Sequence, residues 1–365
     1  MRAVSIIGGR PNIIKAEPLH HSLVKAGIQH EIIDTGVFRK AYGERIYSEL
    51  GLPRPSIILQ PSPTEDYLAN IKFLTGEINT ALDIIKPSVL LIYGDLDPSV
   101  AASLSSLNKN IPFAHIEAGL RNHELNDTEE INRLIIDKFS RLLLCTSNAA
   151  KRNLIREGFN QKDIFVVGNT IISALKRHIK SANTKVLQEL GLENKKYGLL
   201  TIHREENLTS PGRLDKIFKG IEAVQEEIPL IFIKYASTTR ALLRSGYNDF
   251  VSLKNLKTTN TLSYHDYLGV LQNASFIITD SSGIQDETTY LGIPCITCRE
   301  TTHRVDTLEH GNNFLVSDDE EKIILEAKRA LSRKKTSGSY PLEWDMDAGK
   351  SIASVLLDHM EVFHD

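Results

Sequence analysis

Residues 276–292, FIITDSSGIQDETTYLG, show the pattern from which the whole chain is built. Strand-forming residues run into an acid, two serines and a glycine, and a helical pattern follows, which we expect to open near Ile284. A helix start leaves amide N–H groups unpaired and carries partial positive charge, so such a turn suits an anion. Ser281 or Ser282 would equally serve as a simple helix cap, and the turn alone leaves both interpretations open.

The same alternation of short apolar runs and longer amphipathic segments fills the chain. Continuous apolar runs are typical of strands covered on both faces of a parallel sheet. Because the pattern restarts after Gly168-Asn169-Thr170, the sequence predicts two Rossmann-like, doubly wound α/β domains, residues 1–168 and 169–349. The expected strands are AVSIIGG, HEIIDTG, VLLIYGD, PFAHIEAG, LLLCTS and IFVVGN, followed by GLLTIH, LIFIKYA, FVSLKN, FIITD, PCITC and NFLVS.

Composition excludes several classes of protein. The 365 residues are 41% hydrophobic and 24% charged with a net charge of −3, so no basic face predicts a nucleic-acid or membrane partner. No apolar run is long enough to cross a bilayer, and Met1-Arg2 leads directly into a strand pattern rather than a secretory signal. Cys295 and Cys298 form a CxxC without a second pair, which favours core thiols over a zinc or redox site. We therefore expect a soluble cytoplasmic protein.

Polar residues follow the strands at one edge of each expected sheet, where ligands bind in open parallel sheets. Arg10 follows Gly8-Gly9, but GGRPN is not the GxGxxG fingerprint, so a nicotinamide cofactor loses support. A guanidinium there suits a phosphate, and His203 at the edge of the second sheet would add positive charge. Glu287 lies one helical turn beyond Gly283, where a carboxylate suits sugar hydroxyls.

Carboxylates gather after the strands of the first half. These are Asp95, Glu117 and the pair Glu129-Glu130, and each of them alone could be explained as a solvated acid in a loop. Several acids in one cleft push each other's pKa values apart, which lets one site hold both an acid and a base. With a phosphate cradle, they suggest chemistry on a nucleotide sugar.

These residues resemble a known family. The motifs GGRPNIIKAEPL, YGDLDPS, HIEAGLR, TEEINR, GNTIISAL, TIHREEN, DSSGIQDE and RETTHR occur in the order seen in UDP-N-acetylglucosamine 2-epimerases, from Gly8 to about Gly311. The resemblance implies the GT-B architecture, with the active site between two Rossmann-like domains and a last helix, about 350–365, returning to the first domain. It further implies a UDP-sugar substrate, no metal or nicotinamide cofactor, a homodimer and a place in polysaccharide biosynthesis.

The resemblance favours the family's non-hydrolysing members, which interconvert UDP-GlcNAc and UDP-ManNAc by eliminating UDP to a 2-acetamidoglucal and adding it back. Matched motif by motif, the resemblance implies acid/base roles for Asp95, Glu117 and Glu129. The other residues that it implies are Arg133 and His203 in the catalytic site, Arg10, Ser281, Ser282 and Gly283 at the diphosphate, Glu287 at the ribose, Tyr267 on the uracil, and the motif lysine Lys15 at the UDP-sugar.

The chain departs from the family pattern at several places. The usual GTRPE, HGDTTT and DSGG carry Asn12, Tyr93, Asp97 and Ser282 here, and of these Tyr93 and Asp97 leave the exact sugar open. The usual TGQH turn is TGVF, Thr35 to Phe38, so activation by a second substrate molecule loses support. A hydrolysing epimerase, a GT-B glycosyltransferase and a silent UDP-sugar-binding protein remain alternatives.

Overall fold

The computed structural model describes residues 1–37, 45–64, 66–210, 212–244, 253–333 and 338–359. The chain forms two compact units, each with its own parallel sheet. The N-terminal unit comprises Met1–Ala174 with Pro341–Asp365, and the C-terminal unit comprises Leu175–Tyr340. The division falls inside helix α8 (Thr170–His178), whereas the sequence places a boundary just before it. The domain limits 1–168 and 169–349 stay a prediction.

The N-terminal unit contains a seven-stranded sheet in the order β3-β2-β1-β4-β5-β6-β7, and every pairing is parallel. Its central strands β1 and β4 are rich in valine, isoleucine and leucine and are buried almost throughout, so they leave largely apolar runs in the sequence. The strands are β1 (Arg2–Ile7), β2 (Gln29–Asp34), β3 (Ile57–Ile58), β4 (Val89–Tyr93), β5 (Phe113–Ile116), β6 (Leu142–Cys145) and β7 (Ile164–Val166).

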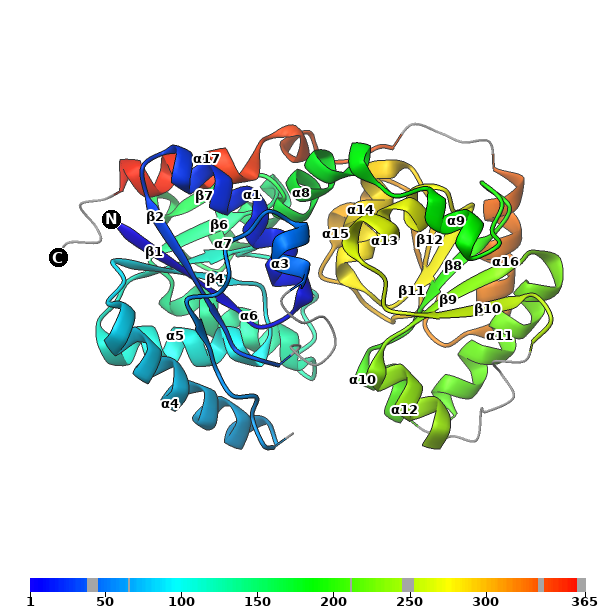
Figure 1. Cartoon of the computed structure of the whole chain (residues 1–365), viewed down its shortest axis with the longest axis horizontal. Helices are drawn as coiled ribbons and strands as arrows, with labels where there is room; N and C mark the ends of the chain where they lie inside the picture. Colours follow the sequence, from blue (N-terminus) through cyan, green and yellow to red (C-terminus); the bar gives the residue numbers. More distant parts are fainter. Residues whose placement is uncertain (38–44, 65, 211, 245–252, 334–337, 360–365) are drawn as a thin grey trace. The chain divides into compact units, whose positions relative to one another are not determined.

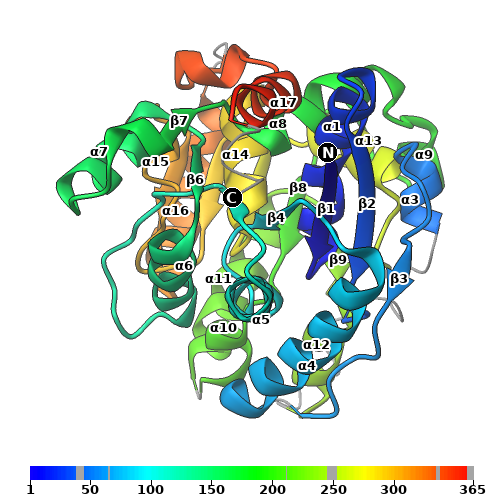
Figure 2. The same ribbon diagram turned by 90° about the vertical axis from the view of Figure 1, so that its left-hand side faces the viewer.

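Helices cover this sheet, and two contacts between them are shown in Figures 1 and 2. Helix α4 packs along α5, and the C-terminal helix α17 packs on α1. Helix α4 begins at a capping aspartate, Asp66, whose side chain accepts a hydrogen bond from the Ala69 amide. The helices are α1 (Arg10–Lys25), α3 (Arg45–Glu49), α4 (Tyr67–Ile85), α5 (Asp97–Lys109), α6 (Thr128–Phe139), α7 (Asn148–Arg156), α8 and α17 (Ala348–Asp358).

The C-terminal unit contains a six-stranded parallel sheet in the order β10-β9-β8-β11-β12-β13. Its strands are β8 (Gly198–Thr201), β9 (Leu230–Lys234), β10 (Leu256–Asn260), β11 (Phe276–Thr279), β12 (Cys295–Thr297) and β13 (Asn313–Leu315). Its helices are α9 (Lys185–Glu189), α10 (Glu205–Thr209), α11 (Arg213–Glu227), α12 (Ala236–Arg244), α13 (Tyr264–Gln272), α14 (Ser282–Leu291), α15 (Val305–Glu309) and α16 (Glu320–Ser332).

The prediction of two doubly wound parallel sheets is confirmed, and the strands that it missed lie at sheet edges. Residues 57–58 form the edge strand β3, which was not expected. FVSLKN was expected as a strand, but β10 begins after it, at Leu256; residues 250–252 of that stretch lie outside the described part. Both edge strands lack a continuous buried run, which is why apolar patterning did not reveal them.

Among the helices of the described ranges, none is long and apolar enough to span a membrane.

Candidate functional site

Each sheet has one point where the strand order reverses, and crevices for ligands form at the carboxyl ends of strands at such points. In the N-terminal unit this point lies between β1 and β4, so the turns carrying Arg10 and Asp95 begin there. In the C-terminal unit it lies between β8 and β11, which are followed by His203 and Asp280. The fold therefore places predicted site residues at the switch point of each unit.

Glu117 follows β5 and pairs with a lysine from α1. Lys15 Nζ donates to Glu117 Oε2 at 2.6 Å, and both side chains are buried. Glu117 has a φ of +76°, a left-handed backbone that costs a non-glycine residue about 1–2 kcal/mol. A Cβ added at Gly94 would lie 3.5 Å from both charged atoms, so the turn after β4 closes over this pair. The structure thus holds Glu117 in a buried, paired and strained position.

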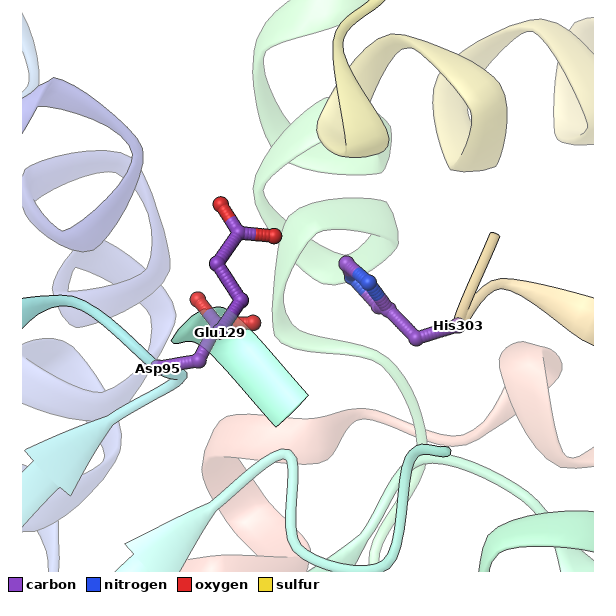
Figure 3. Close-up of side chains that lie close together, drawn as sticks. All are labelled: Asp95, Glu129 and His303. Carbon is purple, nitrogen blue, oxygen red and sulfur yellow. The ribbon is translucent and has the colours of Figure 1, made fainter. Parts of the chain in front are cut away.

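Two further carboxylates of this unit, those of Asp95 and Glu129, lie close to one another (Figure 3). A carboxylate oxygen of Asp95 lies within 4.8 Å of one of Glu129. Arg133, which is 1% exposed, binds Asp95 through Nη1 and donates from Nη2 to Glu130 at 2.7 Å. Two like charges at this separation are compatible because a buried guanidinium compensates one of them.

The two neighbouring glutamates of α6 have different roles. Glu130 is buried and accepts hydrogen bonds from the backbone amides of Asn122 and His123, both at 3.1 Å, as well as from Arg133. Glu129 lies in the first helical turn, behind the cap Asp127, and is only half-buried. Glu130 therefore fixes the loop before α6, and Glu129 is the glutamate of this pair with surface to offer a ligand.

In the C-terminal unit, Asp280 organises the predicted phosphate turn. This fully buried carboxylate accepts hydrogen bonds from the His203 amide at 3.0 Å, the Arg204 amide at 2.9 Å and Asn207 Nδ2 at 3.0 Å. It also lies 3.0 Å from His203 Nδ1. Burial alone would raise the pKa of Asp280, but His203 and these donors outweigh it and lower the pKa to about 2. Asp280 is therefore ionised near neutral pH.

The serines after Asp280 open a helix without capping it. Helix α14 begins at Ser282, two residues earlier than the sequence predicts, because Ser281 already has the extended backbone of a cap residue. The Ser281 side chain makes no capping hydrogen bond. Ser282 Oγ accepts a hydrogen bond from the Arg204 side chain, from Nη2 at 2.9 Å. A ten-residue helix thus starts at a turn with two hydroxyls, Gly283 and a guanidinium, a combination that suits a phosphate.

The two residues predicted to contact uracil and ribose are bound to one another. Tyr267, on α13, donates from its hydroxyl to Glu287 Oε2 on α14 at 2.6 Å. Both side chains are buried, and burial together with Glu287 raises the pKa of Tyr267 well above its ordinary value. Tyr267 also stacks on Tyr264, with ring centroids 6.3 Å apart. Glu287 is therefore oriented from within the unit.

The departures from the family pattern have clear local explanations. Asn12 Oδ1 accepts a hydrogen bond from the Gly8 amide at 3.0 Å, so it supports the glycine turn before Arg10, the first residue of α1. Tyr93 is fully buried, and its hydroxyl lies 2.7 Å from Ser5 Oγ inside the sheet. Asp97 accepts from Asn70 Nδ2 at 2.8 Å. In the TGVF turn, Phe38 lies outside the described residues.

Sequence reasoning assigned no role to Asp280, Asp137 and His115. His115 lies in the middle of the apolar strand PFAHI, and a polar ring buried on both faces of a sheet needs partners. Its partner Asp137 lies 22 residues later, on α6, and Asp280 lies 77 residues after His203. A buried polar residue inside an apolar strand was the available signal, but its partner cannot be read from spacing.

The three cysteines are all buried and free, as the expectation of core thiols requires. Cys295 lies in β12 with its Sγ 3.5 Å from Thr297 Oγ1, and burial raises its pKa to about 11. Burial also raises the pKa of Cys298 well above its ordinary value. Both thiols are therefore protonated near neutral pH, which does not suit metal binding or redox exchange.

Comparison with known proteins gives a family match over most of the chain. A family model described as UDP-N-acetylglucosamine 2-epimerase matches residues 21–357. A UDP-N-acetylglucosamine 2-epimerase from Methanocaldococcus jannaschii is 36% identical over 343 residues, which cover 92% of this chain and 93% of that protein. A UDP-2,3-diacetamido-2,3-dideoxy-D-glucuronate 2-epimerase from Pseudomonas aeruginosa is 30% identical over 340 residues, covering 91% and 93%.

The fold is likewise similar to a solved structure. The Methanocaldococcus jannaschii UDP-GlcNAc 2-epimerase, crystallised in complex with UDP-GlcNAc and UDP, superposes with a TM-score of 0.90 at 34% identity. The alignment covers 98% of this chain and 100% of that one.

Proposed function

Because the chain belongs to the UDP-N-acetylglucosamine 2-epimerase family, we propose that it interconverts UDP-GlcNAc and UDP-ManNAc, or a closely related pair of UDP-hexosamines. The proposed reaction is an elimination followed by an addition. A base removes the C2 proton while the C1–O bond to UDP breaks, giving UDP and a 2-acetamidoglucal. Re-addition of UDP at C1 and protonation of C2 from the other face then give the epimer. The carboxylates of the N-terminal unit would accept the C2 proton on one face of the sugar and donate a proton on the other.

The observation that carries the proposal is the arrangement of Asp95, Glu117 and Glu129 after β4, after β5 and at the start of α6. Inversion at C2 needs one group to take a proton on one face and another to return it on the opposite face. Each candidate lies in a different environment: Glu117 is buried on Lys15, Asp95 is bound to Arg133, and Glu129 is half-buried. Different environments give carboxylates different proton affinities, as acid and base roles require.

Lys15 takes a more specific role in this proposal than a contact to the UDP-sugar. Its ammonium lies 2.6 Å from Glu117, which favours the ionised carboxylate in a buried place. An ionised Glu117 is suited to abstract a proton, and the pairing limits the rotamers that its side chain can adopt. We therefore propose Glu117 as a base and Lys15 as the residue that keeps it charged.

The C-terminal unit would hold the nucleotide. In this proposal the α14 start, with Ser281, Ser282 and Gly283, binds the diphosphate. A diphosphate contact for Arg10 remains a prediction of the sequence. Glu287, oriented by the Tyr267 hydroxyl, accepts hydrogen bonds from the ribose hydroxyls, and the Tyr267 ring lies beside the uracil. Because its Nδ1 is held by Asp280, His203 would direct Nε2 at the departing UDP oxygen.

A proton NMR assay of UDP-GlcNAc in heavy water tests the proposal. Epimerisation predicts UDP-ManNAc carrying deuterium at C2, and deuterium also appears in the recovered UDP-GlcNAc. Free ManNAc with UDP would instead identify a hydrolysing epimerase. Absence of both exchange and release, with UDP-GlcNAc and with UDP-2,3-diacetamido-2,3-dideoxy-glucuronate, would contradict epimerase and hydrolase activity and leave a silent binding protein or a glycosyltransferase.

The second substrate belongs in this assay because one relative is named for it and is 30% identical to this chain. A homodimer and a cytoplasmic location remain predictions of the sequence.

A further inference from the structure

We propose that Asp137 is a positioning residue which, through His115, holds the turns carrying Asp95 and Glu117 in a fixed arrangement; this inference rests on the proposed function. Asp137 lies on α6 and is fully buried, so it contacts no substrate itself. Its two carboxylate oxygens bind the segment of residues 115–121 to α6 and, through His115, also reach the turn at Gly94.

The first oxygen reaches the Asp95 turn through a histidine. Asp137 Oδ1 lies 2.6 Å from His115 Nδ1, and His115 Nε2 lies 2.8 Å from the carbonyl oxygen of Gly94. Gly94 directly precedes Asp95 and has a φ of +60°. The Gly94 amide donates to Ile116 O at 3.0 Å. Both the amide and the carbonyl of Gly94 are therefore bound to β5, the strand that directly precedes Glu117.

The second oxygen secures the far side of the Glu117 turn. Asp137 Oδ2 accepts from the Gly119 amide at 3.1 Å and lies 2.7 Å from Arg121 Nη2. One carboxylate therefore binds residues on both sides of Glu117, at His115 before it and at Gly119 after it. Because Glu117 has a left-handed backbone, a turn without these anchors would relax and carry the base away from its place.

The hydrogen bonds also define the protons of this network. A carbonyl oxygen only accepts, so His115 Nε2 carries the hydrogen that holds the Gly94 carbonyl. Although burial opposes ionisation, His115 and Arg121 lower the pKa of Asp137 below its ordinary value. Arg121 is in turn bound by Glu157, from Nε at 2.8 Å and from Nη2 at 2.7 Å. Asp137 thus contacts both Arg121 and the ring that holds the Gly94 carbonyl, whereas Glu157 lies at the far end, on Arg121.

Simple support of the fold would not require this chemistry. Apolar residues of the same volume would fill the space and usually stabilise a unit as well as a buried ion pair does. Apolar residues could not hold the Gly94 carbonyl, and they could not hold the Gly119 amide. The polar network is therefore best explained by the need to fix the two carboxylate turns.

The test compares Asp137→Asn with Glu157→Gln in the full-length protein. Asn has the same shape but replaces one accepting carboxylate oxygen with an NH₂ donor, so it cannot bind His115, the Gly119 amide and Arg121 together. We expect kcat to fall about 100-fold, as for a misplaced catalytic group, with KM changed less than threefold. Glu157→Gln removes the partly exposed carboxylate from the other end of the network and should keep wild-type kcat. A folded Asp137→Asn protein, as judged by circular dichroism and UDP binding, with wild-type kcat would overturn the proposal.

Two further measurements do not depend on turnover. In Asp137→Asn, amide hydrogen exchange should rise in residues 94–96 and 115–121 but not in the C-terminal unit. In the wild-type protein, ¹⁵N-resolved NMR should show a hydrogen on His115 Nε2, and a ring without hydrogen on Nε2 would overturn the proposal even if Asp137→Asn does not fold. Should no UDP-sugar be epimerised, the proposed function fails, while exchange and ring protonation still decide whether Asp137 fixes these turns.

Discussion

Asp137 and Asp280 make similar contacts in the two units. Each is a fully buried aspartate that lies beside the Nδ1 of a histidine and accepts a hydrogen bond from a backbone amide of a turn. In the N-terminal unit the turn carries Glu117, and in the C-terminal unit it carries His203 and Arg204 and leads to α10, while Asp280 itself precedes the serines of α14. Each unit thus uses one buried carboxylate to organise the edge of its sheet.

The histidines show where the two networks differ. His115 is fully buried, and both of its ring nitrogens lie within hydrogen-bonding distance of protein atoms. The His203 side chain is 33% exposed, and its Nδ1 lies on Asp280 while Nε2 is on the opposite side of the ring. The first histidine is an internal support, whereas the second can present a nitrogen to a ligand. Burial of the partner ring, rather than the presence of a His–Asp pair, separates a structural pair from a candidate catalytic one.

The largest expected effect comes from replacing Glu117, which should stop the reaction without weakening the binding of UDP. Glu117→Gln should lower kcat at least about 1,000-fold, because an amide cannot take the C2 proton. UDP affinity should change less than threefold, since the residues proposed for the diphosphate lie elsewhere in the chain. Steady-state kinetics and calorimetric titration with UDP measure both quantities.

Glu31→Gln is a matched control for the loss of a carboxylate. Glu31 lies in the same unit, where it forms a 3.4 Å ion pair with Arg2 near the surface. This variant should keep wild-type kcat. An equal loss of UDP binding and turnover in Glu117→Gln would assign Glu117 to the structure rather than to the reaction.

Replacing each histidine tests the contrast directly. His203→Asn should lower kcat about 100-fold, as expected for loss of a proton-transfer group, and should cost less than about 1 kcal/mol of stability because the ring is partly exposed. His115→Asn should cost about 3 kcal/mol, because it leaves a buried Asp137 oxygen and the buried Gly94 carbonyl without the ring that binds them. Thermal unfolding and kinetics at a temperature where both variants are folded measure these effects. Equal destabilisation by the two substitutions would remove the distinction.

Acid should affect the units in different pH ranges. Burial, with a contribution from His20, lowers the pKa of His30 from 6.5 to about 3. The unfolded chain then binds a proton at this histidine before the folded chain does, so stability falls as pH drops below 6.5. The loss reaches about 2 kcal/mol at pH 5. The Asp280 carboxyl, with its pKa lowered to about 2, contributes stability that is present above about pH 4 and is lost only toward pH 2.

Region-resolved hydrogen exchange at pH 7 and pH 5 measures this difference. Exchange should rise first around β2, where His30 Nε2 lies 2.8 Å from Ser5 Oγ. His30→Gln can still hydrogen-bond but does not titrate, so it should flatten the loss between pH 6.5 and 5, although His20 also contributes in the same direction. An unchanged loss in His30→Gln would show that other groups govern acid sensitivity.

The sequence revealed those features that leave a local pattern. Central strands such as β4 were found because burial on both faces requires a continuous apolar run. In the edge strand β10 only the first residue, Leu256, is buried, so the apolar pattern placed this strand too early in the chain. Site residues such as Asp95 and Glu117 were identified because they follow strands at the carboxyl edge of a sheet and match family motifs.

Residues that act through distant partners were not assigned. Asp137 and Asp280 gain their importance from histidines 22 and 77 positions away, and only the folded chain brings these groups together. Tyr93 shows the converse: its position in a family motif suggested a link to the sugar, but its ring is buried against Ser5. Spacing indicates which residues share an edge, and packing decides which of them face a ligand.

The smallest expected effect concerns the two serines that open α14. A serine that caps a helix typically contributes about 1 kcal/mol, but the Ser281 hydroxyl makes no capping hydrogen bond. Ser281→Ala should therefore leave the unfolding midpoint nearly unchanged, whereas UDP affinity should fall about 10-fold through the loss of a hydrogen bond to a charged phosphate. Calorimetric titration with UDP and thermal unfolding of the same samples separate the two roles.

Ser282→Gly provides the matched comparison, because it restores the glycine of the family motif DSGG at this position. Ser282 Oγ accepts from Arg204 Nη2, so its loss leaves Nη2 available to the diphosphate, while Arg204 Nε still donates to Asp280 O at 2.8 Å. UDP affinity should then change less than threefold, with a small loss of stability from a glycine in the first turn of the helix. If Ser281→Ala lowers the unfolding midpoint and leaves UDP binding intact, Ser281 is a helix cap, and the diphosphate must be held by the backbone amides and arginines alone.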